Sequence, residues 1–227
     1  MSKRKCLIFD LDGTLLDSIT DIAICMNEVL ESLNLKTYEI SEYKYFVGYG
    51  VDVLVKNVLQ DQIAKSKQDE VVKRFKAKYD DNLHKNTLPY EGIFELLDEL
   101  NKQECKLAVL SNKPDLMTKK YIQTIFKDYK FLEVHGQKDG VPKKPDPIQA
   151  LNIAKSLNEN PSDIFFIGDT KVDMQTAKSA NMKSIGVLWG FRNEKELKEH
   201  GADFIVSTPL EILEIIKKYW QIDFLVI

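Results

Sequence analysis

The composition of this 227-residue chain excludes several classes of protein. Hydrophobic residues make up 44% and charged residues 30%, which is typical of a globular protein with a buried core and argues against disorder. The formal net charge of −3 comes from 32 basic and 35 acidic residues, and no long run of Lys or Arg is present, so we expect no nucleic-acid partner.

Neither the first residues nor the cysteines indicate export or membrane insertion. The apolar stretch after MSKRK is interrupted at Asp10 and is too short for a signal peptide or a membrane span. Cys6, Cys25 and Cys105 are few and odd in number, and they lie in apolar segments, as buried thiols in a reducing compartment do. We therefore expect a cytoplasmic protein with no membrane partner.

Five short apolar runs predict the strands of a parallel sheet. Such runs, alternating with segments whose apolar residues have helical spacing, are typical of a sheet covered on both faces. The predicted fold class is therefore α/β, with a doubly wound parallel sheet. The predicted strands are KCLIF (5–9), KLAVL (106–110), DIFFIG (163–168), KSIGV (183–187) and DFIV (203–206).

The stretch between the first two predicted strands has a helical pattern instead. No strand-like run of comparable strength occurs there, so we predict a smaller α-helical domain over 17–86, inserted into a core domain of 1–16 and 87–227. Pro89 and Gly92 mark the return to the core. The apolar positions with helical spacing include Ile19, Ile22, Ala23, Met26, Val29, Leu30 and Leu33.

The first predicted strand ends in two acids, Asp10 and Asp12. Residues two apart on an extended chain point to the same side, so both side chains face one space at the carboxyl end of the strand. Open α/β sheets bind their ligands at that edge. Asp12 and Gly13 also fit ordinary turn chemistry, but a turn leaves Asp10 unexplained.

A second acidic cluster follows the strand predicted at 163–168. Asp169 comes directly after it, and a helix that begins near Thr170 would direct Asp173 back to the same edge, although Asp and Thr are also common helix caps. If the strands that carry the two clusters are neighbours, unit charges about 4 Å apart repel by roughly 4 kcal/mol at an effective dielectric near 20. Such a cluster needs a cation, and oxygen ligands without His or Cys favour Mg²⁺.

Polar residues near two other predicted strand ends add to this pattern. Ser111 and Asn112 lie just beyond the second strand, where they could bind an anion at the start of the next helix or form a plain turn. Lys143 and Lys144 lie in the loop VPKKPDP. One of them directed at the acids would balance their charge and bind phosphate, although exposed lysine pairs are common.

The order of FDLDGTLLDS, VLSNK, KKPDP and IGDTKVD resembles the haloacid dehalogenase superfamily, and the helical insertion resembles its α-helical C1 cap. The resemblance implies that Asp10 is a nucleophile that forms an aspartyl-phosphate and that Asp12 is the general acid/base. Dehalogenases and phosphonate hydrolases of this fold lack an acid at the second position. The resemblance therefore implies a phosphatase or a phosphomutase.

The same resemblance assigns roles to the remaining motif residues. Asp10, the backbone carbonyl of Asp12 and Asp169 would bind Mg²⁺, and Asp173 would orient Lys144 or a metal-bound water. The expected substrate-binding residues are Thr14, Ser111, Asn112 and Lys144, of which Lys144 is also catalytic.

Within the superfamily the chain is most similar to phosphoglycolate phosphatases, through segments 46–55 and 135–147. Gly48 and Gly50 would let a cap loop approach a small phosphorylated metabolite, or would form a plain interhelical turn. Sugar-phosphate mutases with this cap carry a histidine where Ile22 stands, so hydrolysis is favoured. A pyrophosphatase, a nucleotide or sugar phosphatase, a phosphomutase and a non-catalytic phosphate-binding regulator stay open as alternatives.

Two features of the sequence have no assigned role. The segment YWQIDFLVI (219–227) is unusually apolar for a C-terminus, and it would pack on a sheet edge or on another subunit. Arg192 is a candidate for a position near the acids. We expect a monomer or a weak homodimer.

Overall fold

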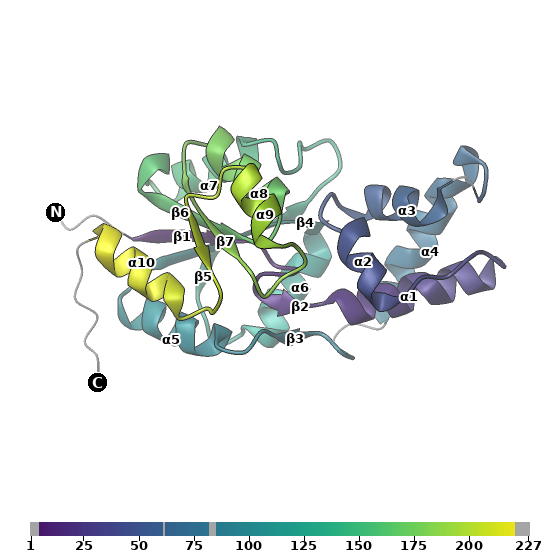
Figure 1. The fold of residues 1–227 in the computed structure, drawn as a ribbon, viewed down its shortest axis with the longest axis horizontal. Helices are drawn as coiled ribbons and strands as arrows, with labels where there is room; N and C mark the ends of the chain where they lie inside the picture. Colours follow the sequence, from purple (N-terminus) through teal and green to yellow (C-terminus); the bar gives the residue numbers. More distant parts are fainter. Residues whose placement is uncertain (1–4, 61, 82–84, 221–227) are drawn as a thin grey trace.

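The computed structural model describes residues 5–60, 62–81 and 85–220, and its centre is a six-stranded sheet (Figure 1). The strand order is β5-β4-β1-β6-β7-β8, and each neighbouring pair is parallel. The predicted α/β fold class is therefore confirmed. The strands are β1 (Cys6–Phe9), β4 (Lys106–Pro114), β5 (Phe131–Gln137), β6 (Ile164–Gly168), β7 (Lys183–Val187) and β8 (Phe204–Val206).

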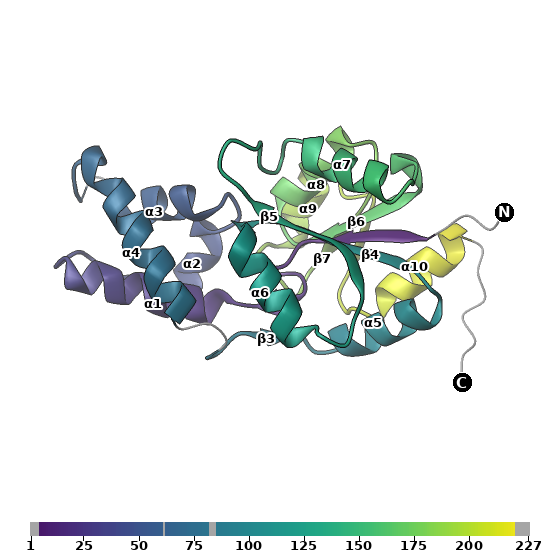
Figure 2. The same cartoon turned by 180° about the vertical axis from the view of Figure 1, so that it is seen from behind.

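Helices cover both faces of this sheet (Figures 1 and 2). In β1, Leu7 and Phe9 belong to one buried cluster with α5, α6 and α10, whereas Cys6 and Ile8 belong to a second cluster with α7 and α8. Burial on both faces is the reason that the strand is uninterruptedly apolar. The helices of this part are α5 (Ile93–Lys102), α6 (Asp115–Ile125), α7 (Ile148–Ser156), η2 (Pro161–Asp163), α8 (Lys171–Ser179), α9 (Glu194–Glu199) and α10 (Glu211–Trp220).

Strand β5 is absent from the sequence-based prediction. It lies at the edge of the sheet, and most of its residues are partly exposed. The side chains of Glu133 and His135 are hydrogen-bonded on it at 2.7 Å, in place of the apolar residues that mark a buried strand. An edge strand is less buried, so the continuous apolar run that identified the other strands is missing here.

Strand β4 is longer than its apolar run predicts. It continues to Pro114, which pairs with Gln137 of β5, and helix α6 begins only at Asp115. Ser111 and Asn112 therefore lie inside the strand. Their expected position just beyond the strand is wrong, because β4 extends past its apolar residues to the pairing of Pro114 with Gln137, whereas their expected role in binding an anion stays a prediction.

Among the described residues, four α-helices and one short 3₁₀ helix form a separate group at the carboxyl ends of the strands (Figures 1 and 2). Helix α1 packs on α2 and α4, and α3 packs on α4. A short antiparallel pair, β2 (Leu16–Asp17) with β3 (Leu88–Pro89), joins the two passages of the chain between this group and the sheet. The domain boundaries at 17 and 86 stay a prediction. The helices are α1 (Ile19–Ser32), α2 (Ile40–Phe46), α3 (Val51–Leu59), η1 (Lys65–Lys67) and α4 (Gln68–Asp81).

The last described residues pack on the sheet. The rings of Tyr219 and Trp220 have their centroids 5.1 and 5.4 Å from that of Phe165 in β6. The rest of the apolar C-terminal segment, 221–227, is outside the described residues. Among the helices in the described part of the chain, none is both long and apolar enough to span a membrane.

Candidate active site

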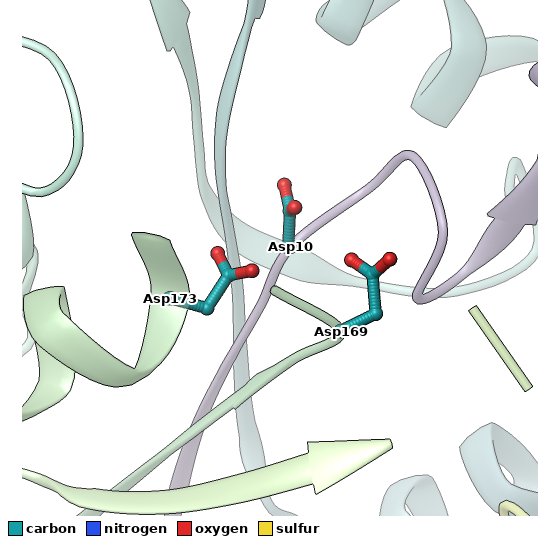
Figure 3. A group of neighbouring side chains, drawn as sticks. All are labelled: Asp10, Asp169 and Asp173. Atoms are coloured by element: carbon teal, nitrogen blue, oxygen red, sulfur yellow. The ribbon is translucent and has the colours of Figure 1, made fainter. Parts of the chain in front are cut away.

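Three carboxylates meet at the carboxyl ends of β1 and β6. Asp10 follows β1 and Asp169 follows β6, and these two strands are paired in parallel register. Asp173 comes from the first turn of α8. One carboxylate oxygen from each of the three lies within 4.8 Å of the others, with Asp10 drawn between Asp169 and Asp173 in Figure 3. The two acidic clusters of the sequence therefore occupy one place.

Lys144 is the cation of this cluster. Its Nζ lies 2.9 Å from Asp10 Oδ1 and 2.6 Å from Asp173 Oδ1, and its side chain is buried. Burial lowers the pKa of Lys144, but the two carboxylates outweigh burial and hold the pKa above its ordinary value. Lys143 lines a neighbouring polar hollow instead. Of the two loop lysines, only Lys144 balances the acids.

If all three acids ionise, the cluster carries more negative than positive charge, and burial opposes this. Burial raises the pKa of Asp10 to about 7, although Lys144 opposes the shift. Burial also raises the pKa of Asp169 well above its ordinary value, with further contributions from Asp173 and Asp10. One lysine does not neutralise three buried acids. The donor set consists of carboxylate oxygens without His or Cys, so it fits a hard divalent cation such as Mg²⁺.

Both oxygens of Asp173 are already engaged. Oδ1 accepts from Lys144, and Oδ2 accepts from the backbone N of Thr170 at 3.1 Å and from its Oγ1 at 2.8 Å. These bonds, with that from Val172 N to Thr170 Oγ1, form a capping box at the start of α8. Asp173 therefore both caps α8 and contacts Lys144, so the capping interpretation and the site interpretation of this segment are compatible.

The carboxylate of Asp169 is contacted by the loop after β7 and by the turn after β1. The backbone N of Phe191 donates to its Oδ2 at 2.8 Å, and Thr14 Oγ1 lies 3.5 Å from its Oδ1. Thr14 is fully buried and is not among the residues that line the adjacent cavity. The turn after Asp12 directs the Thr14 hydroxyl toward Asp169, and its expected contact with a phosphate stays a prediction.

Glycines leave the space that the acids occupy. A Cβ atom built on Gly13, where φ is +87°, would lie 2.3 Å from Asp169 Oδ2. A Cβ on Gly190 would lie 2.3 Å from Asp169 Cβ, and a Cβ on Gly168 would lie 2.3 Å from Asp173 Cβ. Gly168 and Gly190 were not identified as site residues from the sequence, where their only signal is a position beside a strand end.

A cavity of about 60 Å³ lies between the acids and the helical group. This volume is several times what a single water molecule needs, so the space can admit a small group. Asn112 Nδ2 donates to the carbonyl oxygens of Gly48 and Lys144, each at 3.0 Å, and so joins the helical group to the acid cluster. The polar lining includes Asp10, Asp12, Ser111 and Asn112, and the apolar lining includes Ile22, Val47, Val51, Leu54, Phe75 and Met117.

Lys113 is a site residue that the sequence reasoning missed. Its Nζ lies 3.0 and 3.1 Å from the two carboxylate oxygens of Asp12, and it donates to Tyr79 Oη of α4 at 2.9 Å. The available signal was its position two residues after Ser111, which places both side chains on one side of β4.

Arg192 contacts the helical group rather than the acid cluster. Its guanidinium donates to the backbone carbonyl oxygens of Lys44 and Val47, the latter at 3.1 Å, and forms an ion pair with Glu196 at 3.4 Å. Its side chain is 8% exposed. The residue therefore ties the loop after β7 to the end of α2.

Known proteins resemble this chain along most of its length. A family model for haloacid dehalogenase-like hydrolases matches residues 7–187. A phosphoglycolate phosphatase from Aquifex aeolicus is 33% identical, with 95% of this chain and 98% of that protein aligned, and one from Colwellia psychrerythraea is 30% identical over 96% and 99%.

A crystal structure gives the same result. A protein from Lactobacillus delbrueckii subsp. bulgaricus, provisionally named phosphoglycolate phosphatase, superposes with a TM-score of 0.89. It is 31% identical, and the match covers 94% of this chain and 98% of that one. The chain belongs to the haloacid dehalogenase-like hydrolase family, as the order of its motifs predicts.

Proposed function

We propose that this protein is a Mg²⁺-dependent phosphatase that hydrolyses a small phosphomonoester through an aspartyl-phosphate on Asp10. The observation that carries the proposal is the meeting of Asp10 and Asp169, from paired strands, with Lys144 beside a small cavity. A buried, net-negative cluster of oxygen donors beside a lysine suits the transfer of a phosphoryl group, whose charge must be neutralised.

We assign the two carboxylate ligands from the same geometry, and the backbone carbonyl of Asp12 from the family resemblance. Asp10, Asp169 and the backbone carbonyl of Asp12 would hold Mg²⁺, and Asp173 would orient Lys144, because both of its oxygens are engaged. When bound, the ion supplies positive charge that neutralises the acids and the substrate's phosphate oxygens. This role agrees with the excess of negative charge in the cluster.

Asp10 is the proposed nucleophile because its two oxygens differ. Oδ1 accepts from the backbone N of Leu11 at 2.7 Å and pairs with Lys144. Oδ2 accepts no hydrogen bond from the described residues, so it is the oxygen that we assign to attack on phosphorus. A new bond forms between Oδ2 and phosphorus as the bond from phosphorus to the leaving oxygen breaks.

Asp12 is the proposed general acid/base. It gives its proton to the leaving oxygen in the first step and takes a proton from water in the second, when that water attacks the phosphorus of the aspartyl-phosphate. Inorganic phosphate then leaves and Asp10 is regenerated. Asp12 lines the cavity beside Asp10, as both steps require.

The phosphate group would be bound by Lys144, Ser111 and Asn112. Lys144 neutralises Asp10 and can share its charge with a phosphate oxygen, while Ser111 and Asn112 line the cavity from β4. Thr14 supports Asp169 in this assignment, since its hydroxyl faces that acid.

Phosphoglycolate is the first substrate to test, because relatives matched over nearly their whole length carry the name phosphoglycolate phosphatase. The small cavity agrees with a small ester. Ile22 lines the cavity with a side chain that cannot transfer a proton, which favours hydrolysis over a phosphomutase reaction.

A panel of small phosphate esters tests the proposal, with phosphoglycolate, nucleoside monophosphates, sugar phosphates, pyrophosphate and p-nitrophenyl phosphate assayed for phosphate release. We expect release that requires Mg²⁺, is abolished by EDTA and is lost in Asp10→Asn. Asp128→Asn, at an exposed position, is the matched control and should keep full activity. Metal-independent release, full activity of Asp10→Asn, or isomeric sugar phosphate without free phosphate would contradict the proposal.

A further inference from the structure

Lys113 is buried where the sheet meets the helical group. Its side chain is 4% exposed, and its Nζ lies 4.5 and 4.9 Å from the ring centroids of Tyr79 and Tyr121. Tyr79 belongs to α4 of the helical group, Tyr121 to α6 beside the sheet, and Asp12 to the turn after β1. One ammonium group therefore contacts both parts of the molecule and the proposed acid/base.

The hydrogen bonds of the ammonium group go to protein atoms. A lysine has three N–H donors. The Nζ of Lys113 donates to Asp12 Oδ1, Asp12 Oδ2 and Tyr79 Oη, at distances between 2.9 and 3.1 Å. Although Lys113 lines the cavity, its donors are used by protein atoms, so its contacts suit holding Asp12 better than binding substrate.

The two oxygens of Asp12 are held unequally. Oδ1 accepts from Lys113 and also from Ser18 Oγ at 2.6 Å, whereas Oδ2 accepts from Lys113 alone among the described residues. Ser18 is the N-cap residue of α1, so this second bond also comes from the helical group. Oδ2 keeps the free lone pair that a proton transfer needs.

We propose that Lys113 is a positioning residue that couples closure of the helical group to the orientation of Asp12. With α1 and α4 in place, Ser18 and Tyr79 complete the contacts through which Lys113 fixes the carboxylate, with Oδ2 available for proton transfer. When the helical group moves away, Lys113 loses the Tyr79 oxygen and ring, and Asp12 loses the Ser18 hydroxyl. The inference rests on the proposed function of Asp12 as acid/base.

Two aryl esters separate this role from a contribution to folding. Phenolate is about as basic as an ionised tyrosine side chain, so it needs a proton as it leaves. The p-nitrophenolate ion is a much weaker base and leaves with little help. In Lys113→Met, kcat/KM for phenyl phosphate should fall about 30-fold more than kcat/KM for p-nitrophenyl phosphate. Tyr79→Phe, which removes one oxygen, should show the same selectivity with a smaller loss of about 5-fold.

Lys106→Met is the matched control. Lys106 lies on the same strand and is largely buried, with its Nζ 2.7 Å from Glu159, but it is at the opposite end of β4 from the site. The substitution removes a buried lysine charge without touching Asp12. The ratio of the two kcat/KM values should therefore stay as in the wild type, even if stability falls.

Asp12→Asn shows whether Lys113 acts through Asp12. Alone, Asp12→Asn should produce the largest selective loss for phenyl phosphate, and adding Lys113→Met should lower kcat/KM little further. Independent, multiplicative losses would overturn the inference, as would an equal loss for the two aryl esters in Lys113→Met. A loss in Lys113→Met confined to phosphoglycolate would also overturn it, because it would make Lys113 a ligand of the substrate carboxylate.

Failure of the proposed function gives a different pattern. If the wild type releases no phosphate from any ester, or if Asp12→Asn hydrolyses phenyl phosphate at the wild-type rate, the assignment of Asp12 is wrong irrespective of Lys113. If Lys113→Met does not fold, as judged by circular dichroism, Tyr79→Phe carries the test. The inference then fails if Tyr79→Phe leaves the ratio of the two kcat/KM values unchanged.

Discussion

Arg192 donates a hydrogen bond to the backbone carbonyl oxygen of Val47 at 3.1 Å, although the two residues are 145 positions apart. The bond joins the loop after β7 to the segment that precedes Gly48 and Gly50, both of which line the cavity. The observed position of the helical group is therefore held by polar contacts as well as by apolar packing.

Arg192→Met should weaken these contacts. The substitution leaves the carbonyl oxygens of Lys44 and Val47 without their donor, so we expect the free energy of unfolding to fall by about 1–2 kcal/mol and KM to rise several-fold. Urea unfolding and steady-state kinetics measure the two effects. Arg74→Met is the control, because the pair of Arg74 with Glu70 is exposed and its loss should change neither quantity. An unchanged KM in Arg192→Met would contradict this role.

Lys144→Met should damage both stability and activity. It leaves Asp10 and Asp173 buried without their cation, and breaking a buried ion pair in this way costs about 3–5 kcal/mol. Chemical denaturation and the phosphate-release assay test both effects. A variant as stable as the wild type would show that the two carboxylates do not depend on Lys144.

Removal of metal should have an effect that depends on pH. The raised pKa of Asp10, about 7 against an ordinary value near 3.9, means that the folded protein binds this proton more tightly than the unfolded chain. The stability of the metal-free protein should therefore fall as pH rises between these values and level off above the higher one. A bound cation replaces the proton, so the increase in Tm from Mg²⁺ over EDTA should be larger at about pH 8 than at about pH 5. The opposite order would contradict a site at Asp10.

Asp21 should stabilise the protein with the opposite dependence on pH. Burial raises the pKa of Asp21, but hydrogen bonds from Thr87 and Asn86 outweigh burial and hold the pKa below its ordinary value. A lowered pKa gives stability that is present above the unfolded value and is lost as pH falls through the folded one. Asp21→Asn should cost about 2 kcal/mol at neutral pH, and the difference from the wild type should shrink in acid, as followed by urea unfolding. A constant difference would exclude this explanation.

Gly190→Ala should displace Asp169. The added methyl group would meet Asp169 Cβ and the backbone oxygen of Gly13, each at 2.3 Å, where neither can move freely. We expect a loss of activity of at least about 100-fold, because displaced catalytic groups have effects of that size. Gly186→Ala on β7 meets the end of the Leu197 side chain at 3.0 Å and serves as the milder control. Equal activity of both variants would contradict close packing at Gly190.

The sequence predicted the acids of the site better than it predicted their supports. Asp10 and Asp169 follow buried strands, so their apolar runs located them and the parallel sheet brought them together. Lys113 was missed because its partners, Asp12 and Tyr79, come from segments far away along the chain. A contact between such segments leaves no local period in the sequence.

The same physical difference explains the errors in the fold. Strands buried on both faces have continuous apolar runs, whereas β5 and the last residues of β4 are defined by backbone pairing with each other. Every residue has a backbone hydrogen-bond acceptor, and every residue except proline has a backbone donor. The extension of β4 past its apolar residues could therefore not be predicted from its side chains.

The antiparallel pair of β2 and β3 has a consequence for how this architecture can change. Leu16 lies opposite Pro89 and Asp17 opposite Leu88, so the inserted segment leaves the core and returns to it through neighbouring strands, about 5 Å apart. Such an insertion resembles a loop whose ends already meet, so its length and shape are nearly independent of the sheet's hydrogen bonding. A lineage with this arrangement can exchange the inserted helices and keep the acid cluster at the strand ends unaltered.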